Sequence, residues 1–201
     1  MLQKINSQNP ESEIVEQTVE ILVSGGVVAY PTDTIYGLGC DAFNSTAIDK
    51  IYALKNRDTS KPMSLICRDI EQIKQLAEIN DFQEQILSTY LPGPYTFILK
   101  AKPEAPQKLV SSLGTLGIRI PDNQFCLEVV KKLNSPLITT SVNLAGQPNL
   151  NSATEIDRLF GDQLDLILDA GEINNQPSTI IDLTQSEPKI IRQGAGKFEN
   201  I

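Results

Sequence analysis

Three short stretches of the chain combine hydroxyl, amide and cationic side chains of the kind that hold a small anionic ligand. Residues 31–39 (PTDTIYGLG) follow an apolar run and place two threonines and an aspartate beside glycines. Residues 55–61 hold two lysines and an arginine, and residues 139–143 (TTSVN) follow another apolar run. Arginine binds phosphate or carboxylate oxygens in pairs, lysine acts as a point charge, and hydroxyls add donors without charge. Together the stretches suit a triphosphate or a similar polar ligand.

Each stretch also has an ordinary structural explanation. Threonine and aspartate hold the backbone of plain turns, hydroxyls and amides close strand ends, and cations at a helix C-terminus complement the helix dipole. The charge distribution favours a ligand-binding role for the basic stretch. Residues 50–68 carry five bases and one acid, whereas the rest of the chain sums to −12. A triphosphate requires positive charge that is concentrated in this way.

The composition excludes several kinds of chemistry. The chain has 201 residues, a net charge of −8 and no histidine. Without histidine there is no Ser-His-Asp or Cys-His nucleophile, and no metal site built on imidazole. Cys40, Cys67 and Cys126 form no Cys-x-x-Cys pair, so we expect buried thiols in a reducing cytoplasm. No Walker A or Rossmann glycine motif occurs, so a bound nucleotide needs a different cradle.

Length and hydropathy predict one soluble domain. Hydrophobic residues make up 40% of the chain, which is enough to form a core. No apolar run approaches the roughly 18–20 residues of a membrane span, and the first residues lack the apolar run of a signal peptide. We therefore expect a single domain over residues 1–201, located in the cytoplasm and not attached to a membrane.

Helices and strands intermix along the chain. Apolar spacing predicts helices over residues 10–23, 45–54, 70–76, 82–91, 123–133 and 152–160, with N-caps that include Asn9 and Asp122. Short apolar runs predict strands at 27–30, 63–67, 95–99, 118–120, 137–141, 166–168, 179–183 and 189–192. The elements do not follow a strict βαβ order. We therefore expect an α/β fold with a mixed parallel and antiparallel sheet rather than a doubly wound parallel one.

Taken in order, these stretches resemble the YrdC-like family of threonylcarbamoyl-AMP synthases. The similarity runs from about residue 14 to residue 196, nearly the whole chain. Its marks are the segments 31–39, the Lys-x-Arg at 55–57 and the Ser-x-Asn at 141–143, supported by 92–96, 117–121, 178–182 and 192–194. The resemblance is to the short, single-domain form of the family. It implies a twisted mixed sheet with helices packed around it and a concave, positively lined cavity on one face.

The resemblance also implies a reaction. L-Threonine, bicarbonate or CO2, and ATP would give L-threonylcarbamoyladenylate and pyrophosphate, so the chain would be a nucleotidyltransferase. A downstream tRNA-modifying transferase complex would receive the product and form N6-threonylcarbamoyladenosine at position 37 of tRNA. Mg²⁺ would be carried mainly by the ATP phosphates, with no metal site of the protein's own.

Two sets of site residues follow from the resemblance, position by position. The L-threonine side comprises Thr34, Arg119, Thr139 and Ser178. The ATP side comprises Lys55, Arg57, Lys61, Thr115, Ser141, Asn143, Asn149 and Arg192. Arg119 would face the amino-acid carboxylate, and Lys55 and Arg57 would carry the catalytic role. Catalysis would depend on positioning and on neutralising charge at the phosphates, neither of which needs histidine.

Two other functions of the same fold stay open. One is a non-catalytic module that binds double-stranded RNA, at least weakly, in the positive cavity. The net charge of −8 and the absence of an RNP-type aromatic signature argue against it. The other is an inactive paralogous branch that lacks the Lys-x-Arg and Ser-x-Asn pairs. Both pairs are intact here, whereas residues 95–100 (YTFILK) are similar to that branch.

Overall fold

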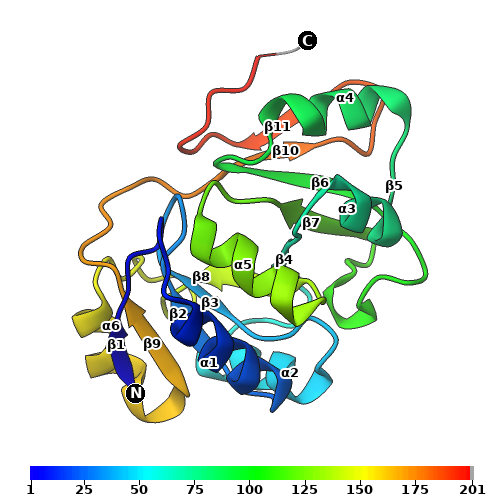
Figure 1. Cartoon of the computed structure of the whole chain (residues 1–201). Helices are drawn as coiled ribbons and strands as arrows, with labels where there is room; N and C mark the ends of the chain where they lie inside the picture. The colour runs from blue at the N-terminus through cyan, green and yellow to red at the C-terminus, as the bar shows by residue number, and fades with distance from the viewer. Residues whose placement is uncertain (200–201) are drawn as a thin grey trace.

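A strongly twisted sheet runs through the computed structural model, which describes residues 1–199 (Figure 1). In this part of the chain eleven strands pair in the order β1-β9-β2-β3-β8-β4-β7-β6-β10-β11, with β5 beside β6. The strands are β1 (Leu2–Lys4), β2 (Val28–Tyr30), β3 (Gly37–Gly39), β4 (Ser64–Ile66), β5 (Ala77–Glu78), β6 (Tyr95–Ala101), β7 (Thr115–Arg119), β8 (Leu137–Ser141), β9 (Leu166–Asp169), β10 (Thr179–Asp182) and β11 (Lys189–Arg192). The helices are α1 (Ser12–Val23), α2 (Ser45–Leu54), α3 (Ile70–Leu76), α4 (Asp81–Tyr90), α5 (Gln124–Leu133) and α6 (Ala153–Phe160), with short 3-10 turns at Gln107–Leu109 and Gly161–Gln163.

The sheet mixes both kinds of strand pairing. The pairs β1–β9, β2–β9, β4–β7 and β6–β10 are parallel. The pairs β2–β3, β3–β8, β4–β8, β5–β6, β6–β7 and β10–β11 are antiparallel. This arrangement confirms the mixed α/β fold expected from the sequence.

The central strands carry very different side chains on their two faces. One face presents a row of completely buried apolar residues: Leu38, Ile138, Leu65, Ile118, Phe97 and Ile181. Helices α2, α3, α4 and α6 pack on this row in one apolar cluster. Because strand side chains alternate, the neighbouring positions must face the opposite way. These positions are occupied by small or hydroxyl-bearing residues: Gly37, Thr139, Ser64, Gly117 and Thr96.

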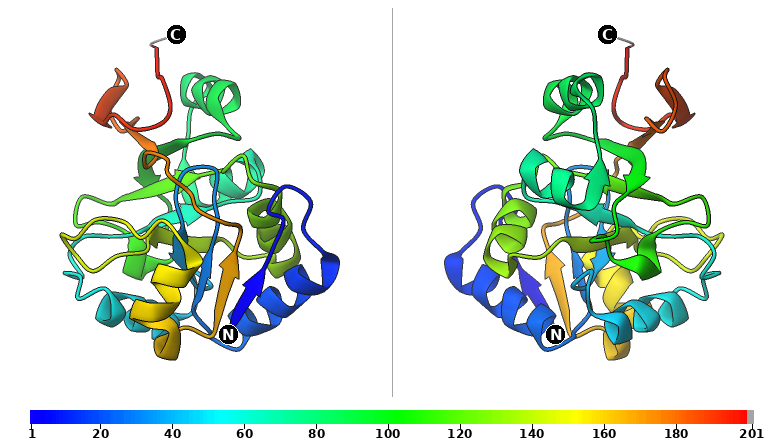
Figure 2. Two further views of the ribbon diagram at one scale, coloured as in Figure 1. Left: turned by 90° about the vertical axis from the view of Figure 1, so that its left-hand side faces the viewer. Right: turned by 90° about the vertical axis from the view of Figure 1, so that its right-hand side faces the viewer.

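Helices α1 and α5 cover part of this second face. Seen at 90° to the first view, they lie on one side of the sheet, whereas α2 and α6 lie on the other (Figure 2). Their apolar residues pack on Val28, Tyr30, Ile66, Leu137 and Leu166. The small and hydroxyl-bearing positions of the central strands lie outside this cluster, and Gly37, Thr139, Ser64 and Thr96 line the pocket described below.

Two helix starts differ from the sequence-based expectation. The N-cap predicted at Asn9 is wrong, because α1 begins two residues later and residues 6–9 form a turn in which Asn6 Oδ1 accepts from the Asn9 N–H (3.2 Å). The N-cap predicted at Asp122 is also wrong. Asn123 caps α5 by accepting from the Cys126 N–H (3.0 Å). Within the described residues, none of the helices is long and apolar enough to span a membrane.

Strand β3 lies inside the candidate ligand-binding stretch 31–39, where the sequence predicted no strand. Its glycines carry no strand signal, yet a Cβ at Gly39 would lie 2.1 Å from the carbonyl oxygen of Ile138. Glycine is therefore what allows β3 to pair closely with β8. The short strands β1 and β5 were also not expected. The predicted single domain over 1–201 includes residues 200 and 201, which lie outside the described range, and its extent stays a prediction.

Candidate functional site

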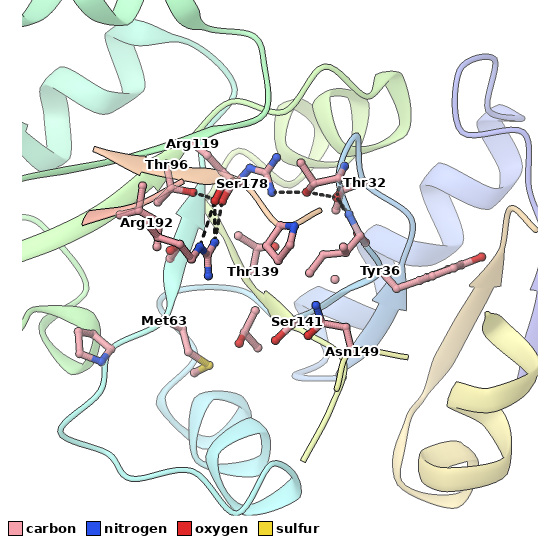
Figure 3. Close-up of a pocket in the computed structure, with 18 of the residues that line it drawn as sticks. Thr32, Tyr36, Met63, Thr96, Arg119, Thr139, Ser141, Asn149, Ser178 and Arg192 are labelled. Carbon is pink, nitrogen blue, oxygen red and sulfur yellow. Dashed lines mark hydrogen bonds between the residues drawn. The ribbon is translucent and has the colours of Figure 1, made fainter. Parts of the chain in front are cut away.

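A pocket of about 230 Å³ lies on the polar face of β8, β4, β6 and the end of β7, with Ser178 and Arg192 at its far side (Figure 3). Three arginines line it, and within the described residues its lining contains no carboxylate. Eight of the predicted site residues contribute to the lining: Thr34, Arg57, Arg119, Thr139, Ser141, Asn149, Ser178 and Arg192. Four do not: Lys55, Lys61, Thr115 and Asn143. The pocket therefore brings together residues from distant parts of the sequence in a setting suited to an anion.

Arg119 is fixed at the end of β7 and is 4% exposed. Its Nη2 donates to Asp33 Oδ1 (2.5 Å) and its Nη1 donates to Thr34 Oγ1 (3.2 Å). Within the described residues, its buried Nε–H has no hydrogen-bond partner. An unpaired buried donor costs about 1–3 kcal/mol. This N–H therefore marks a point at which a ligand oxygen could accept a hydrogen bond that no protein group among the described residues accepts.

Thr32 organises the turn that carries the partners of Arg119. Its Oγ1 accepts from the backbone N–H groups of Thr34 (3.1 Å) and Ile35 (3.2 Å), and donates to the Ile35 carbonyl (2.6 Å). Such a side-chain-to-backbone turn fixes the two residues that follow the threonine. Asp33, held there, also accepts from the Asp122 N–H (3.2 Å). Thr32 and Asp33 belong to the stretch 31–39 that the sequence marked as a candidate, but they were absent from the two sets of predicted site residues.

Ser178 and Arg192 form the opposite side of the pocket, on strands that follow a long connection. The segment between β9 and β10, orange in Figure 1, crosses the molecule and brings Ser178 beside β6. Thr96 Oγ1 and Ser178 Oγ are hydrogen-bonded (2.8 Å), and Arg192 donates through Nη2 (2.7 Å) and Nε (3.2 Å) to the Ser178 carbonyl. Burial, and then the positive charge of Arg119, lower the pKa of Arg192. Thr96 is a second lining residue that sequence reasoning missed.

The two short sequence pairs form one hydrogen-bond network. The Lys55 ammonium is buried and donates to the carbonyls of Ser141 and Asn143 (2.9 Å for Asn143) and to Asn143 Oδ1 (2.8 Å). Ser141 Oγ donates to the same Oδ1 (2.7 Å), and Asn143 Nδ2 donates to the Gln147 carbonyl (2.6 Å). An ammonium has three N–H donors, and all of them are used here. Lys55 thus holds the loop after β8 instead of reaching the pocket lining.

Arg57 reaches the lining, whereas Lys61 and Thr115 do not. Its Nε donates to the Lys61 carbonyl (2.9 Å) and its Nη2 donates to the Pro62 carbonyl (3.2 Å). Lys61 therefore supports Arg57 through its backbone. Thr115 Oγ1 is hydrogen-bonded to Ser111 Oγ (2.7 Å) in the connection between β6 and β7.

The three cysteines are buried free thiols, as expected from the sequence. Burial raises the pKa of Cys40 to about 12, and it raises the pKa values of Cys67 and Cys126 further. At neutral pH these side chains are therefore uncharged apolar groups.

We expect Lys55 to make the free energy of unfolding depend on pH in the alkaline range. Burial, and then the charge of Arg57, lower its pKa from 10.5 to about 8. Between these values the unfolded chain holds the proton more tightly than the folded protein, so the free energy of unfolding rises with pH. Urea unfolding at several pH values should show this rise for the wild type relative to Lys55→Met. A constant difference between the two proteins from pH 8 to 10.5 would contradict the prediction.

Comparison with known proteins places this geometry in a family. The family model for Sua5, YciO and YrdC proteins, described as "Telomere recombination", matches residues 20–194. The chain belongs to the Sua5/YciO/YrdC family. This confirms the family resemblance found in the sequence.

Members of the Sua5/YciO/YrdC family with different descriptions resemble the chain to a similar degree. The crystal structure of Escherichia coli YciO, a protein described as uncharacterized, has a TM-score of 0.92 and 32% identity, covering 98% of this chain and 97% of YciO. A Klebsiella pneumoniae protein named threonylcarbamoyl-AMP synthase is 33% identical over 191 residues, which is 94% of this chain and 100% of that protein. The structure of P. abyssi Sua5 complexed with L-threonine has a TM-score of 0.90 and 28% identity, covering 96% of this chain and 57% of Sua5. The fold is therefore that of YciO and Sua5.

Proposed function

We propose that this chain is a threonylcarbamoyl-AMP synthase that uses L-threonine, bicarbonate or CO2, and ATP. The observation that carries the proposal is the buried Nε–H of Arg119, which has no hydrogen-bond partner among residues 1–199, in a pocket that also contains Arg57, Arg192 and several hydroxyls. Such a pocket suits a carboxylate at one end and phosphates at the other. The synthase name of the Klebsiella relative and the L-threonine complex of P. abyssi Sua5 support this function.

The L-threonine end is formed around Arg119. Its guanidinium, held by Asp33 and Thr34, would bind the amino-acid carboxylate. The hydroxyls of Thr34, Thr139 and Ser178 would then hold the amine and the side-chain hydroxyl of the substrate. Because these groups are already fixed by the protein, little ordering is required when the substrate binds.

The ATP end is formed by the other two arginines and the loop after β8. Arg57 and Arg192 would bind phosphate oxygens, and Ser141 and Asn149 would add neutral contacts. Lys55 and Asn143 would act through the shape of the loop, with Lys61 and Thr115 outside the lining. Mg²⁺ would enter as part of the MgATP substrate. A concentration of fixed positive groups stabilises the charge that develops on the phosphates.

The reaction balances without a histidine base. The threonine nitrogen attacks the carbon of bicarbonate, so an N–C bond forms and a C–OH bond breaks. The free amino group of L-threonine is an ammonium at neutral pH, so a substrate phosphate or bicarbonate takes one of its protons before the attack. The hydroxide then leaves as water with a second proton from the nitrogen. A carbamate oxygen then attacks the α-phosphorus of ATP and pyrophosphate leaves. The protein contributes by holding the reactants in line and neutralising charge. The product would pass in the cytoplasm to a tRNA-modifying transferase complex.

We expect pyrophosphate release from MgATP to require both L-threonine and bicarbonate. The experiment omits each substrate in turn from CO2-depleted buffer, and mass spectrometry identifies threonylcarbamoyl-AMP. Release without L-threonine would indicate a different nucleotide-cleaving activity. If the folded protein binds ATP but releases no pyrophosphate with all substrates present, the synthase proposal is wrong and the inactive branch is favoured.

A further inference from the structure

The segment that follows β11, residues 193–199, folds back over the start of β10 at the far side of the pocket. Thr179 Oγ1 donates to the Gly196 carbonyl (2.6 Å), and the Ala195 N–H donates to the Pro177 carbonyl (2.9 Å). The segment is therefore bonded to the chain one residue before and one residue after the serine that lines the pocket.

Aromatic side chains anchor the end of this segment outside the pocket. The ring of Phe198 lies 4.8 Å from the ring of Tyr90, the last residue of α4, and 6.4 Å from that of Phe97 in β6. Ring pairs at such distances stabilise a contact beyond the area that they bury. The Tyr95 hydroxyl also donates to the Lys197 carbonyl (2.8 Å). In the side views the segment accordingly runs between the β10–β11 hairpin and α4 (Figure 2).

Strand β11 has little other support. Within the described residues it pairs only with β10, and all four of its residues are exposed. An edge strand with few buried contacts opens locally at a low cost in free energy. Arg192 is the last residue of this strand, and it donates to the Ser178 carbonyl (2.7 Å) from there. The segment 193–199 is therefore the part of the chain that fixes where the Arg192 guanidinium lies.

We propose that Phe198 is a positioning residue for the pocket: its ring anchors the segment 193–199, and this segment holds Arg192 in the lining. Phe198 itself lies outside the lining, so it acts through Arg192. With the ring in place, the guanidinium is already oriented, and little ordering is required when a polyphosphate binds. That this polyphosphate is MgATP rests on the proposed function.

Binding of a fluorescent ATP analogue with Mg²⁺ to the full chain tests the proposal. Phe198→Ala should raise the Kd about three- to tenfold, because the freed segment must be ordered again when the nucleotide binds. Phe198→Met keeps a large apolar side chain against Tyr90 and should stay within about twofold of the wild type. The matched control is Phe43→Ala, which removes an exposed phenylalanine (53%) in the turn before α2 and should leave the Kd unchanged. A Kd that Phe198→Ala does not change would overturn the proposal.

A double-mutant cycle with Arg192→Ala distinguishes positioning from a general loss of stability. If Phe198 acts through Arg192, Phe198→Ala should change the Kd by less than about twofold once the guanidinium is absent. An equal rise in both backgrounds would show that Phe198 has only a structural role. If Phe198→Ala does not fold, Tyr95→Phe takes its place, because it removes only the hydroxyl that donates to the Lys197 carbonyl. Its expected rise is about two- to threefold and should depend on Arg192 in the same way.

Comparing nucleotide binding with product formation separates this proposal from the synthase proposal. If the wild type makes no threonylcarbamoyl-AMP, but binds the analogue and loses affinity with Phe198→Ala only when Arg192 is present, the positioning role stands and the synthase proposal fails. If the wild type makes product and Phe198→Ala leaves both the Kd and the rate unchanged, the positioning role fails and the synthase proposal stands. If the wild type makes no product and does not bind the analogue, both fail.

Discussion

Arg119→Gln should lower kcat/KM for L-threonine by about 100- to 1,000-fold. This is the loss expected when the charged group that binds the substrate carboxylate, itself held in place by two hydrogen bonds to the protein, is removed. Arg119 lines the pocket and pairs with the buried carboxylate of Asp33, and in the described part of the chain its Nε–H has no partner and is available to a ligand. Glutamine keeps a polar side chain but has neither the charge nor the forked donor geometry. The measurement is the initial rate of pyrophosphate release over a range of L-threonine concentrations, with ATP saturating.

The same substitution also affects folding, so it requires a control. The side chains of Arg119 and Asp33 are 5% and 8% exposed, and removing one partner of a buried ion pair costs about 3–5 kcal/mol. The double variant Asp33→Asn, Arg119→Gln removes both charges and should recover much of that stability in urea unfolding, yet it should remain unable to use L-threonine. If Arg119→Gln is folded and retains the wild-type KM for L-threonine, Arg119 is not the carboxylate partner.

The sheet was predictable from sequence where its strands bury an apolar face. The segment 137–141 (LITTS) begins with two apolar residues and continues with three hydroxyl-bearing ones, and the structure makes it β8 with Ile138 in the core and Thr139 in the pocket. Strand β3 was missed for the opposite reason. Its sequence, Gly-Leu-Gly, has a single apolar residue, and it is a strand because β8 approaches it too closely for a side chain at Gly39. Contacts of this kind depend on the neighbouring strand and leave no pattern in the local amino-acid sequence.

The site was predictable as a set of residues but not as a division of roles. Hydroxyls and cations at strand and helix ends pointed to a ligand, and most of them do line one pocket. Nothing in the spacing showed that the Lys55 ammonium would donate its hydrogen bonds to Ser141 and Asn143, more than 80 positions away in the sequence. Likewise, Asp33 and Thr32 matter because Arg119 lies opposite their turn, a proximity that only the folded sheet creates.

We expect Lys55→Met to abolish most activity by releasing the loop after β8, with an effect that depends on Asn143. The substitution leaves the Ser141 and Asn143 carbonyls and Asn143 Oδ1 without their buried donor. The expected destabilisation is about 2–4 kcal/mol, because hydrogen bonds to a charged group contribute about 1.5–3 kcal/mol and buried acceptors are left unpaired. Urea unfolding measures the stability, and inhibition by a non-hydrolysable ATP analogue measures the nucleotide site.

A double-mutant cycle with Asn143→Ala decides how Lys55 acts on ATP. If Lys55 acts by holding the loop, Lys55→Met adds little to the loss of ATP affinity already caused by Asn143→Ala, and the coupling energy is about 1–3 kcal/mol. If Lys55 binds phosphate directly, the two losses add, because the ammonium would lose a ligand contact that Asn143 does not share. The geometry favours strong coupling, since each N–H of the ammonium already has an acceptor in this loop. In that case the charge at the ATP end of the pocket comes from Arg57 and Arg192, which line it directly.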